Sequence, residues 1–211
     1  MFAVEDRLTD YERWREDRNQ AMDAGRKPSV RVDTATAWAA AAAESGVDSI
    51  IAEESDIRIV QLPGAADRPR GPRFGTLVHA VLATVLLDAD EGVVARTAET
   101  QGRILGAPGT EVAAAATVVS AVLRHELMDR ARAAALVRRE TPLSWLQKDG
   151  TLIEGVLDLA FDERGVTTVV DFKTDHELAA GEARYRAQLQ QYVNAVAAVT
   201  RRQAEGVLFR I

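Results

Sequence analysis

The chain has 211 residues, a formal net charge of -6 and no cysteine. That length suits one large domain or two small ones, and 47% apolar against 27% charged residues exclude a disordered chain. The missing cysteine excludes disulfides, cysteine-based zinc sites and cysteine-ligated iron–sulfur clusters. The acidic balance argues against non-specific cationic binding to nucleic acid.

The chain carries no sign of a secretory or membrane segment. Its N-terminus is charged from Glu5 onward, which is unlike a signal peptide. The longest apolar stretch, residues 77–87, is too short to span a bilayer. We therefore expect a cytoplasmic protein without membrane contact.

Two helices and a short strand are predicted for the first 46 residues. Residues 4–22 are polar, with opposite charges at helical spacing, so we expect a solvated helix. Residues 29–46 then give a short strand and a helix. Thr34 or Thr36 is its expected N-cap, and Gly46 its expected end.

The middle of the chain is predicted to be mainly helical. Residues 56–62 alternate as a strand, and residues 63–72 have the composition of a loop. Three helices are then expected, over residues 74–87, 90–105 and 110–136.

The last third changes character and predicts a sheet. Three strand-like runs, at 138–147, 151–163 and 166–175, are followed by a helix over 180–200 and a strand over 205–211. This order predicts an α/β fold, in which a central mixed sheet with an antiparallel meander is flanked by helices.

The turns of the meander fix its expected register. Taking residues 164–165 as a two-residue hairpin turn places Asp158 directly opposite Asp171. Opposed side chains share a face, and Lys173 shares that face with Asp171 by the two-residue period of a strand. Two carboxylates and a lysine are therefore expected on one side of the sheet.

The preceding hairpin adds a third carboxylate. A three-residue loop at 148–150 brings Glu140 opposite Asp158, whereas a two-residue loop would send Glu140 to the other face. The three-residue loop is preferred because it keeps the opposite face apolar. That predicted core face comprises Leu143, Trp145, Ile153, Gly155, Leu157, Leu159, Phe161, Thr168, Val170 and Phe172.

Clustered carboxylates repel one another unless a cation or a proton relieves them. Oxygen ligands of this kind suit Mg²⁺ or Mn²⁺, and a divalent ion beside a lysine fits hydrolysis of a phosphodiester. The alternative is that these side chains form ordinary cross-strand pairs on the solvent side of a sheet.

Five short segments in a fixed order resemble a known family. FGTLVHAVL, RRETP, GVLDLAF, VVDFKTD and QLQQY resemble the PD-(D/E)XK nuclease superfamily. More narrowly, they resemble the C-terminal nuclease domain of RecB- and AddA-like (UvrD/Rep-related) helicase–nucleases. The resemblance covers residues 33–211 and implies the restriction-endonuclease-like core. Residues 1–32 resemble a linker or helical extension from a preceding helicase motor.

The resemblance assigns roles residue by residue. It implies that His79, Asp158 and Asp171 are metal ligands, that Phe172 offers its backbone carbonyl to the metal, and that Lys173 is the catalytic lysine. Phe172 stands where the family often has tyrosine. Its place on the predicted core face makes that replacement tolerable.

Three further residues receive supporting roles from the resemblance. Glu140 would support the metal through water or contact the nucleic acid, and Gln188 and Tyr192 would position the lysine or the DNA backbone. Two roles stay open for Tyr185, one turn before Gln188: its side chain lines a groove, or it only packs against its neighbours. His125 is assigned to a charged helix surface without a role.

The resemblance thus implies a metal-dependent deoxyribonuclease domain, an exonuclease on single strands, in a helicase–nuclease of double-strand-break repair. Its implied cofactor is Mg²⁺ or Mn²⁺. Its implied partners are DNA, an N-terminal helicase motor and an AddB/RecC-like subunit. The iron–sulfur branch of the family is excluded by the absence of cysteine. The alternative is a catalytically inactive nuclease fold that binds DNA or acts as a scaffold.

Overall fold

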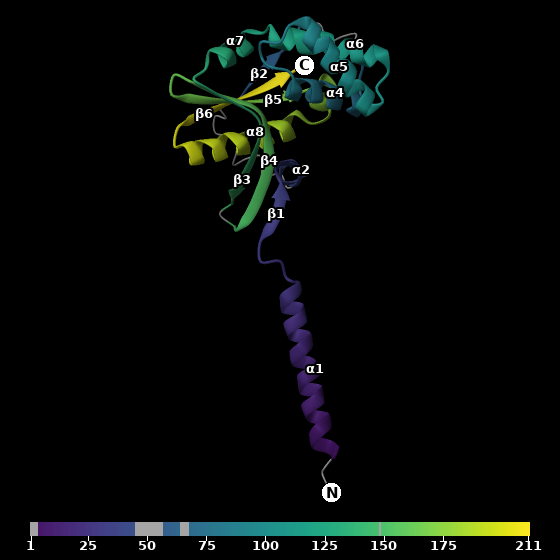
Figure 1. Ribbon diagram of the computed structural model, residues 1–211. Helices are drawn as coiled ribbons and strands as arrows, with labels where there is room; N and C mark the ends of the chain where they lie inside the picture. Colours follow the sequence, from purple (N-terminus) through teal and green to yellow (C-terminus); the bar gives the residue numbers. More distant parts are fainter. Residues whose placement is uncertain (1–3, 45–56, 64–67, 148) are drawn as a thin grey trace.

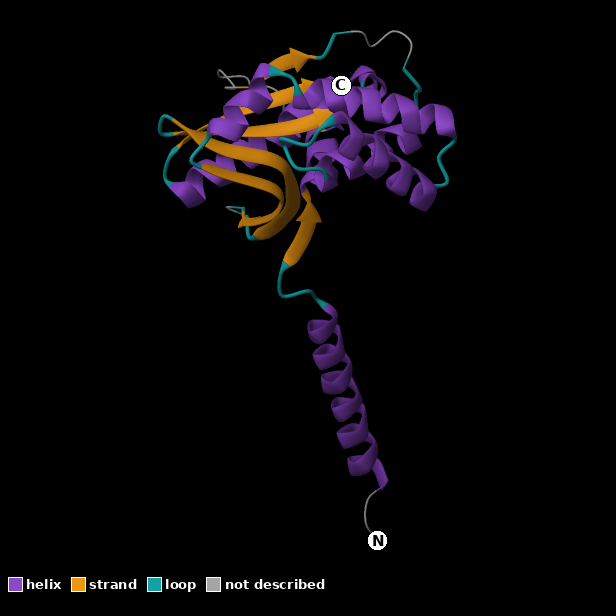
Figure 2. Cartoon of the chain, turned by 45° about the horizontal axis from the view of Figure 1, so that its top comes forward, coloured by secondary structure: helices purple, strands orange, loops and turns teal. Residues whose placement is uncertain are grey.

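The computed structural model describes residues 4–44, 57–63, 68–147 and 149–211. A mixed sheet forms the centre of the body, and helices cover both of its faces (Figures 1 and 2). Helix α1 (Val4–Arg26) projects away from that body. Its residues 7–26 are all exposed, so the expected solvated helix is confirmed and runs one turn further than predicted.

The sheet has six strands, in the order β1-β4-β5-β6-β2, with β3 paired to β4. The β3–β4 and β4–β5 pairs are antiparallel, and the other pairs are parallel. The predicted mixed sheet with an antiparallel meander is therefore confirmed. Its strands are β1 (Arg31–Thr34), β2 (Ile57–Gln61), β3 (Leu136–Leu146), β4 (Thr151–Glu163), β5 (Val166–Lys173) and β6 (Gln203–Arg210).

Both predicted hairpin registers are confirmed over the paired residues, but the ladders do not include the two pairs predicted for Asp158, with Asp171 and with Glu140. Leu159 pairs with Val170 across β4 and β5, and also with Arg139 across β3 and β4. The two turn glycines have the positive φ that these short loops require, 84° at Gly150 and 85° at Gly165. Local turn chemistry thus determines which side chains stand opposite one another.

Helices α4 to α7 lie on one face of the sheet, and α8 with α2 lies on the other. The backbone N–H of Ala37 donates to Thr34 Oγ1 at 3.1 Å, which confirms Thr34 as the cap of α2. Gly46, the predicted end of that helix, lies outside the described residues. The helices are α2 (Ala35–Glu44), α4 (Pro72–Thr84), α5 (Glu91–Leu105), α6 (Gly109–Leu123), α7 (Glu126–Ala133) and α8 (Asp175–Thr200).

The single helix predicted over 110–136 is wrong, because the chain breaks between α6 and α7. His125 adopts an extended backbone there, and its Nδ1 accepts the N–H of Leu127 at 3.1 Å. Its ring also packs on Phe209, with centroids 4.8 Å apart. His125 is thus a helix cap set against the core, and its assignment to a charged surface is corrected.

The prediction that the sheet has one buried apolar face and one polar face is also wrong. Leu159, Phe161, Val170 and Phe172 pack under α4–α7, as expected. The opposite face is buried as well, because α8 covers it. The predicted core face divides between two cores, since Leu143, Trp145, Ile153 and Leu157 pack with α8 and α2.

A change of partners along β4 explains this division. Residues 151–154 of β4 pair with β1, and residues 159–163 pair with β5. Between these segments the alternation of side chains shifts, so that Leu157 and Leu159 face different cores. On β3 the bend falls at Glu140, which has a φ of 45° and leaves a gap in the ladder opposite Asp158.

Across the part of the chain that the structure describes, no helix has both the length and the apolar character that crossing a membrane requires.

Candidate active site

Asp158 stands where β4 leaves one neighbouring strand and joins another. Its Oδ2 accepts the backbone N–H of Phe172 on β5 at 2.8 Å. The carboxylate therefore takes a backbone donor of β5 at the position where the β4–β5 ladder has stopped. Strand divergence thus directs this side chain toward the end of β5.

Asp171 and Lys173 form an ion pair at the end of β5. Lys173 Nζ lies 2.7 Å from Asp171 Oδ2, and the two side chains are only 10% and 5% exposed. Lys173 Nζ also donates to the backbone oxygen of Phe172 at 3.2 Å. The shared face of Asp171 and Lys173, predicted from strand period, is confirmed by this contact.

His79 reaches the site from helix α4. Its neighbours Leu77, Val78 and Val81 are fully buried and fix that helix on the sheet. His79 Nδ1 lies 3.8 Å from Asp158 Oδ2, and its side chain remains 28% exposed. A helix and two strands therefore bring His79, Asp158, Asp171 and Lys173 to one place.

Burial dominates the electrostatics of the two aspartates. Desolvation raises the pKa of Asp171 to about 6, although Lys173 opposes the rise. Desolvation also raises the pKa of Asp158, against the attraction of His79 and Lys173. The charge of Asp158 also raises the pKa of Asp171, so a cation placed between the two carboxylates would lower the free energy of their ionised forms.

The donor set fits a hard divalent ion in its chemistry. Two desolvated carboxylates and one imidazole are ligands that Mg²⁺ or Mn²⁺ accepts. Within the described residues, no group of three or more acidic, histidine or cysteine side chains is already arranged to hold a metal. The Lys173–Asp171 ion pair would have to adjust when a cation binds.

Glu140 and Phe172 lie close to the same aspartate. Glu140 is exposed, and it lines a small cavity together with Asp158 and Phe172. Its charge raises the pKa of Asp158 as a smaller cause. The Phe172 ring packs in the core, 5.8 Å from the Phe209 ring, as its parity predicts.

Gln188 and Tyr192 form a hydrogen-bonded pair on α8. Gln188 Nε2 donates to the Tyr192 hydroxyl at 3.0 Å, and both side chains are buried. Gln188 Oε1 has no hydrogen-bond partner among the described residues. Burial raises the pKa of Tyr192, and Asp171, Lys173 and Asp158 also act on it. The pair therefore lies within electrostatic reach of the carboxylates.

Two residues near the site receive no definite role from the sequence. Lys173 Nζ lies 5.0 Å from the centroid of the Tyr185 ring, which is within the range of a cation–π contact. Arg139 donates to the backbone oxygens of Leu82 and Val85, at the end of the helix that carries His79. The sequence gives little sign of this contact, because Val85 lies 54 residues before Arg139 and the alternation of a strand does not indicate a distant partner.

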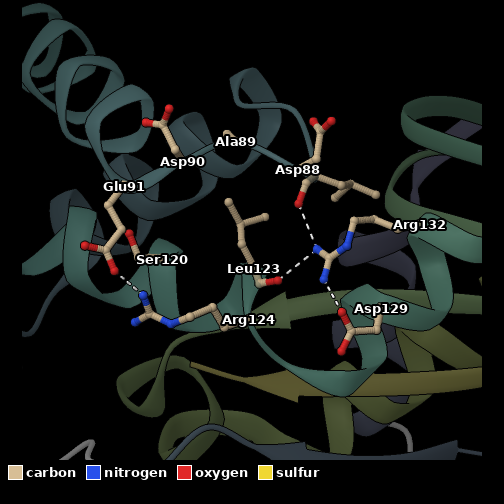
Figure 3. Close-up of a pocket in the computed structure, with 10 residues that line it drawn as sticks. Asp88, Ala89, Asp90, Glu91, Ser120, Leu123, Arg124, Asp129 and Arg132 are labelled. Carbon is tan, nitrogen blue, oxygen red and sulfur yellow. Dashed lines mark hydrogen bonds and ion pairs between the residues drawn. The ribbon is translucent and has the colours of Figure 1, made fainter.

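Two cavities of about 720 Å³ open on the described surface. One is lined by Tyr192 together with residues of β3, β4 and the start of α2. The other contains none of the predicted site residues. Figure 3 shows that its charges are largely paired within the cavity, Arg124 with Glu91 and Arg132 with Asp129.

Two comparisons with known proteins bear on this site. A family model described as the PD-(D/E)XK nuclease superfamily matches residues 54–211. An ATP-dependent helicase/nuclease subunit of Desulforudis audaxviator (strain MP104C) is 30% identical over 152 residues, covering 63% of this chain. The match covers 12% of that relative's own length.

Proposed function

Because this chain belongs to the PD-(D/E)XK nuclease superfamily, we propose that it hydrolyses DNA phosphodiesters with the help of Mg²⁺ or Mn²⁺. The observation that carries the proposal is the gathering of Asp158, Asp171, His79 and Lys173 at the end of β5. A bound divalent ion would supply charge neutralisation and activation of water.

The residues of the chain have distinct roles in this proposal. Asp158, Asp171 and His79 would hold the ion, with the backbone oxygen of Phe172 beside them. The Lys173 ammonium would donate hydrogen bonds to the attacking water or to the phosphate oxygens, whose negative charge grows during attack. Water adds to phosphorus, the bond to one sugar oxygen breaks, and that oxygen takes a proton.

Glu140, Gln188 and Tyr192 would support this chemistry from its edge. Glu140 is exposed beside Asp158 and would act through water or contact the substrate. The Gln188–Tyr192 pair would position Lys173 or the DNA backbone, as their mutual hydrogen bond and buried setting favour.

We extend the proposal to the biological setting on the strength of the relative's name. That protein belongs to a helicase/nuclease, and this chain matches a short part of it. We propose that the chain is the nuclease domain of such a protein and degrades single strands delivered by a helicase motor during double-strand-break repair in the cytoplasm. Residues 33–211 would form this domain, residues 1–32 would connect it to the motor, and a second subunit of AddB/RecC type is an expected partner.

This setting accounts for a nuclease with a net charge of -6. A bound cation offsets part of the negative charge at the site, and a motor that holds DNA relieves the domain of most phosphate contacts.

The proposal is tested by incubating the purified chain with a labelled single-stranded oligonucleotide and Mg²⁺ or Mn²⁺. We expect cleavage that requires the metal and disappears in Asp171→Ala and Lys173→Ala. Asp88→Ala changes an exposed acid in the cavity of Figure 3, which contains none of the predicted site residues, and is the matched control. Cleavage by Asp171→Ala and Lys173→Ala at the wild-type rate would contradict the proposal.

Calorimetric titration with Mn²⁺ separates this enzyme from an inactive scaffold. An active site requires binding that Asp158→Ala abolishes. Binding that is absent, or unchanged in that variant, would favour the scaffold.

A further inference from the structure

Among the described residues, the edge of β4 that faces β1 and β5 has no ladder partner between these two neighbours. The β1–β4 register ends at Glu154, and the β4–β5 register begins at Leu159. One cavity of about 720 Å³ opens at this gap, which is within the range of about 300–1,000 Å³ that small-ligand sites occupy. Its lining residues are Thr34, Ala35, Thr36, Pro142, Leu143, Ser144, Glu154, Gly155, Val156 and Tyr192.

The chemistry of this cavity is unsuited to a phosphate. None of its ten described lining residues is basic, and Glu154 contributes a negative charge. Sites that follow a nucleic-acid backbone rely on lysine and arginine. Hydroxyls from Thr34, Thr36 and Ser144 beside apolar Pro142 and Val156 instead match an uncharged base and sugar.

The cavity borders the candidate active site at Tyr192. That side chain lines the cavity, and its hydroxyl accepts a hydrogen bond from Gln188 at 3.0 Å. Along β4, Gly155 and Val156 also line the cavity and come just before Asp158. A strand of substrate placed at Asp158 would therefore extend into the cavity along the open edge of β4.

We propose that this cavity receives one unpaired nucleotide of the substrate strand, base and sugar, next to the position of cleavage. It thereby makes the nuclease selective for single strands, because a base in a duplex must first leave its stack and its partner. The inference rests on the proposed function and adds to it the place where single-strand selectivity arises.

Two substitutions test the cavity without touching the carboxylates. Val156→Glu and Ser144→Glu each place a carboxylate in the cavity from an exposed position on β4 or β3. Leu146→Glu is the matched control, because it adds the same charge to an exposed position of β3 that does not line the cavity. Thermal unfolding of each variant verifies that it folds. The two cavity variants lie on different strands, so each is an independent test of the cavity.

The first measurement is the affinity for a fluorescent single-stranded oligonucleotide of mixed sequence, by anisotropy at fixed ionic strength. We expect Val156→Glu and Ser144→Glu to raise the dissociation constant at least about tenfold. Leu146→Glu should change it by less than about twofold. Equal affinity in all three variants, or no binding by the wild-type chain, would overturn the inference.

The second measurement is hydrolysis of bis(4-nitrophenyl) phosphate, a small diester that needs no nucleotide site. Its rate should be the same in the wild-type chain and all three variants. A lower rate in the cavity variants alone would show that they damage the catalytic groups and would overturn the inference. A wild-type chain that binds single-stranded DNA but hydrolyses neither DNA nor bis(4-nitrophenyl) phosphate would instead refute the proposed function. The ratio of the dissociation constants of the cavity variants to that of the wild-type chain would then still decide the inference.

Discussion

Gly155 lies directly against the ring of Tyr192. A methyl group at Gly155 would come within 2.5 Å of Tyr192 Cε1 and 2.6 Å of its hydroxyl oxygen. The Tyr192 ring also meets Trp145 edge-on, with centroids 6.2 Å apart. The position of the Tyr192 hydroxyl therefore depends on a missing side chain on the strand that carries Asp158.

Gly155→Ala is expected to lower both stability and cleavage. The added methyl must displace Tyr192, and overpacking of this kind costs about 1–3 kcal/mol. Thermal unfolding and the cleavage rate measure the two effects. Gly109→Ala is the control, since a methyl there has no neighbour within 4 Å. Equal effects of the two substitutions would contradict this account of Tyr192.

Lys173→Met is expected to lower the cleavage rate by about 10²–10³-fold, a usual cost of losing a charged group in catalysis. Methionine retains the length of the chain but cannot donate to Asp171 or to a phosphate oxygen. Lys27→Met serves as the matched control because Lys27 is exposed in the segment after α1. If both variants cleave at the wild-type rate, Lys173 has no catalytic role.

Because the pKa of Asp171 is raised, the free energy of unfolding of the wild-type chain and that of Asp171→Asn should depend differently on pH when no metal is present. The pKa of Asp171 rises from 3.8 to about 6 because of burial. The folded chain therefore holds a proton that the unfolded chain releases between these values. The contribution of Asp171 to stability thus falls as pH rises from 4 toward 6 and stays low above it.

Urea unfolding between pH 4 and pH 7 measures this effect. The free energy of unfolding of Asp171→Asn should increase relative to the wild-type value as pH rises, by at most about 1.4 kcal/mol per pH unit. A difference that is constant across the range would show that burial does not raise the pKa of Asp171.

Replacing His79 and replacing His125 should affect different properties of the chain. His79→Ala is expected to weaken Mn²⁺ binding at least about tenfold, since it removes a proposed ligand or a close partner of one. His125→Ala should lower stability by about 1 kcal/mol, because it removes the cap of α7. Calorimetry with Mn²⁺ and thermal unfolding of both variants measure this contrast, which loss of metal binding in His125→Ala would contradict.

The sequence predicts most of the pairing of β3, β4 and β5, because short turns between neighbouring strands determine that pairing. Gly150 and Gly165 set the two turns, and the turns set the pairing of β4 with β5 as far as Leu159 and Val170, which adjoin Asp158 and Asp171. The motifs also indicate the superfamily correctly, because residues 54–211 match its model. Turn geometry and short motifs require no knowledge of distant contacts.

The errors arise where distant segments decide the structure. Helix α8 buries the face that carries Asp171, and no pattern within β5 distinguishes such a cover from solvent. The bend at Glu140 follows from the transfer of β4 between β1 and β5, which are far apart in the chain. His125 ends one helix and begins another through a side-chain hydrogen bond that helix periodicity does not reveal.

Helix α1 has a geometric consequence for anything joined to its first turn. Its 23 residues span about 34 Å at 1.5 Å per residue. A neighbour joined to that turn would therefore be separated from the segment after Arg26 by a helical spacer of this length. Removing four residues would shorten the spacer by about 6 Å and rotate its two ends by about 40° relative to each other, so the length of α1 sets how far such a neighbour lies from the end of the helix at Arg26.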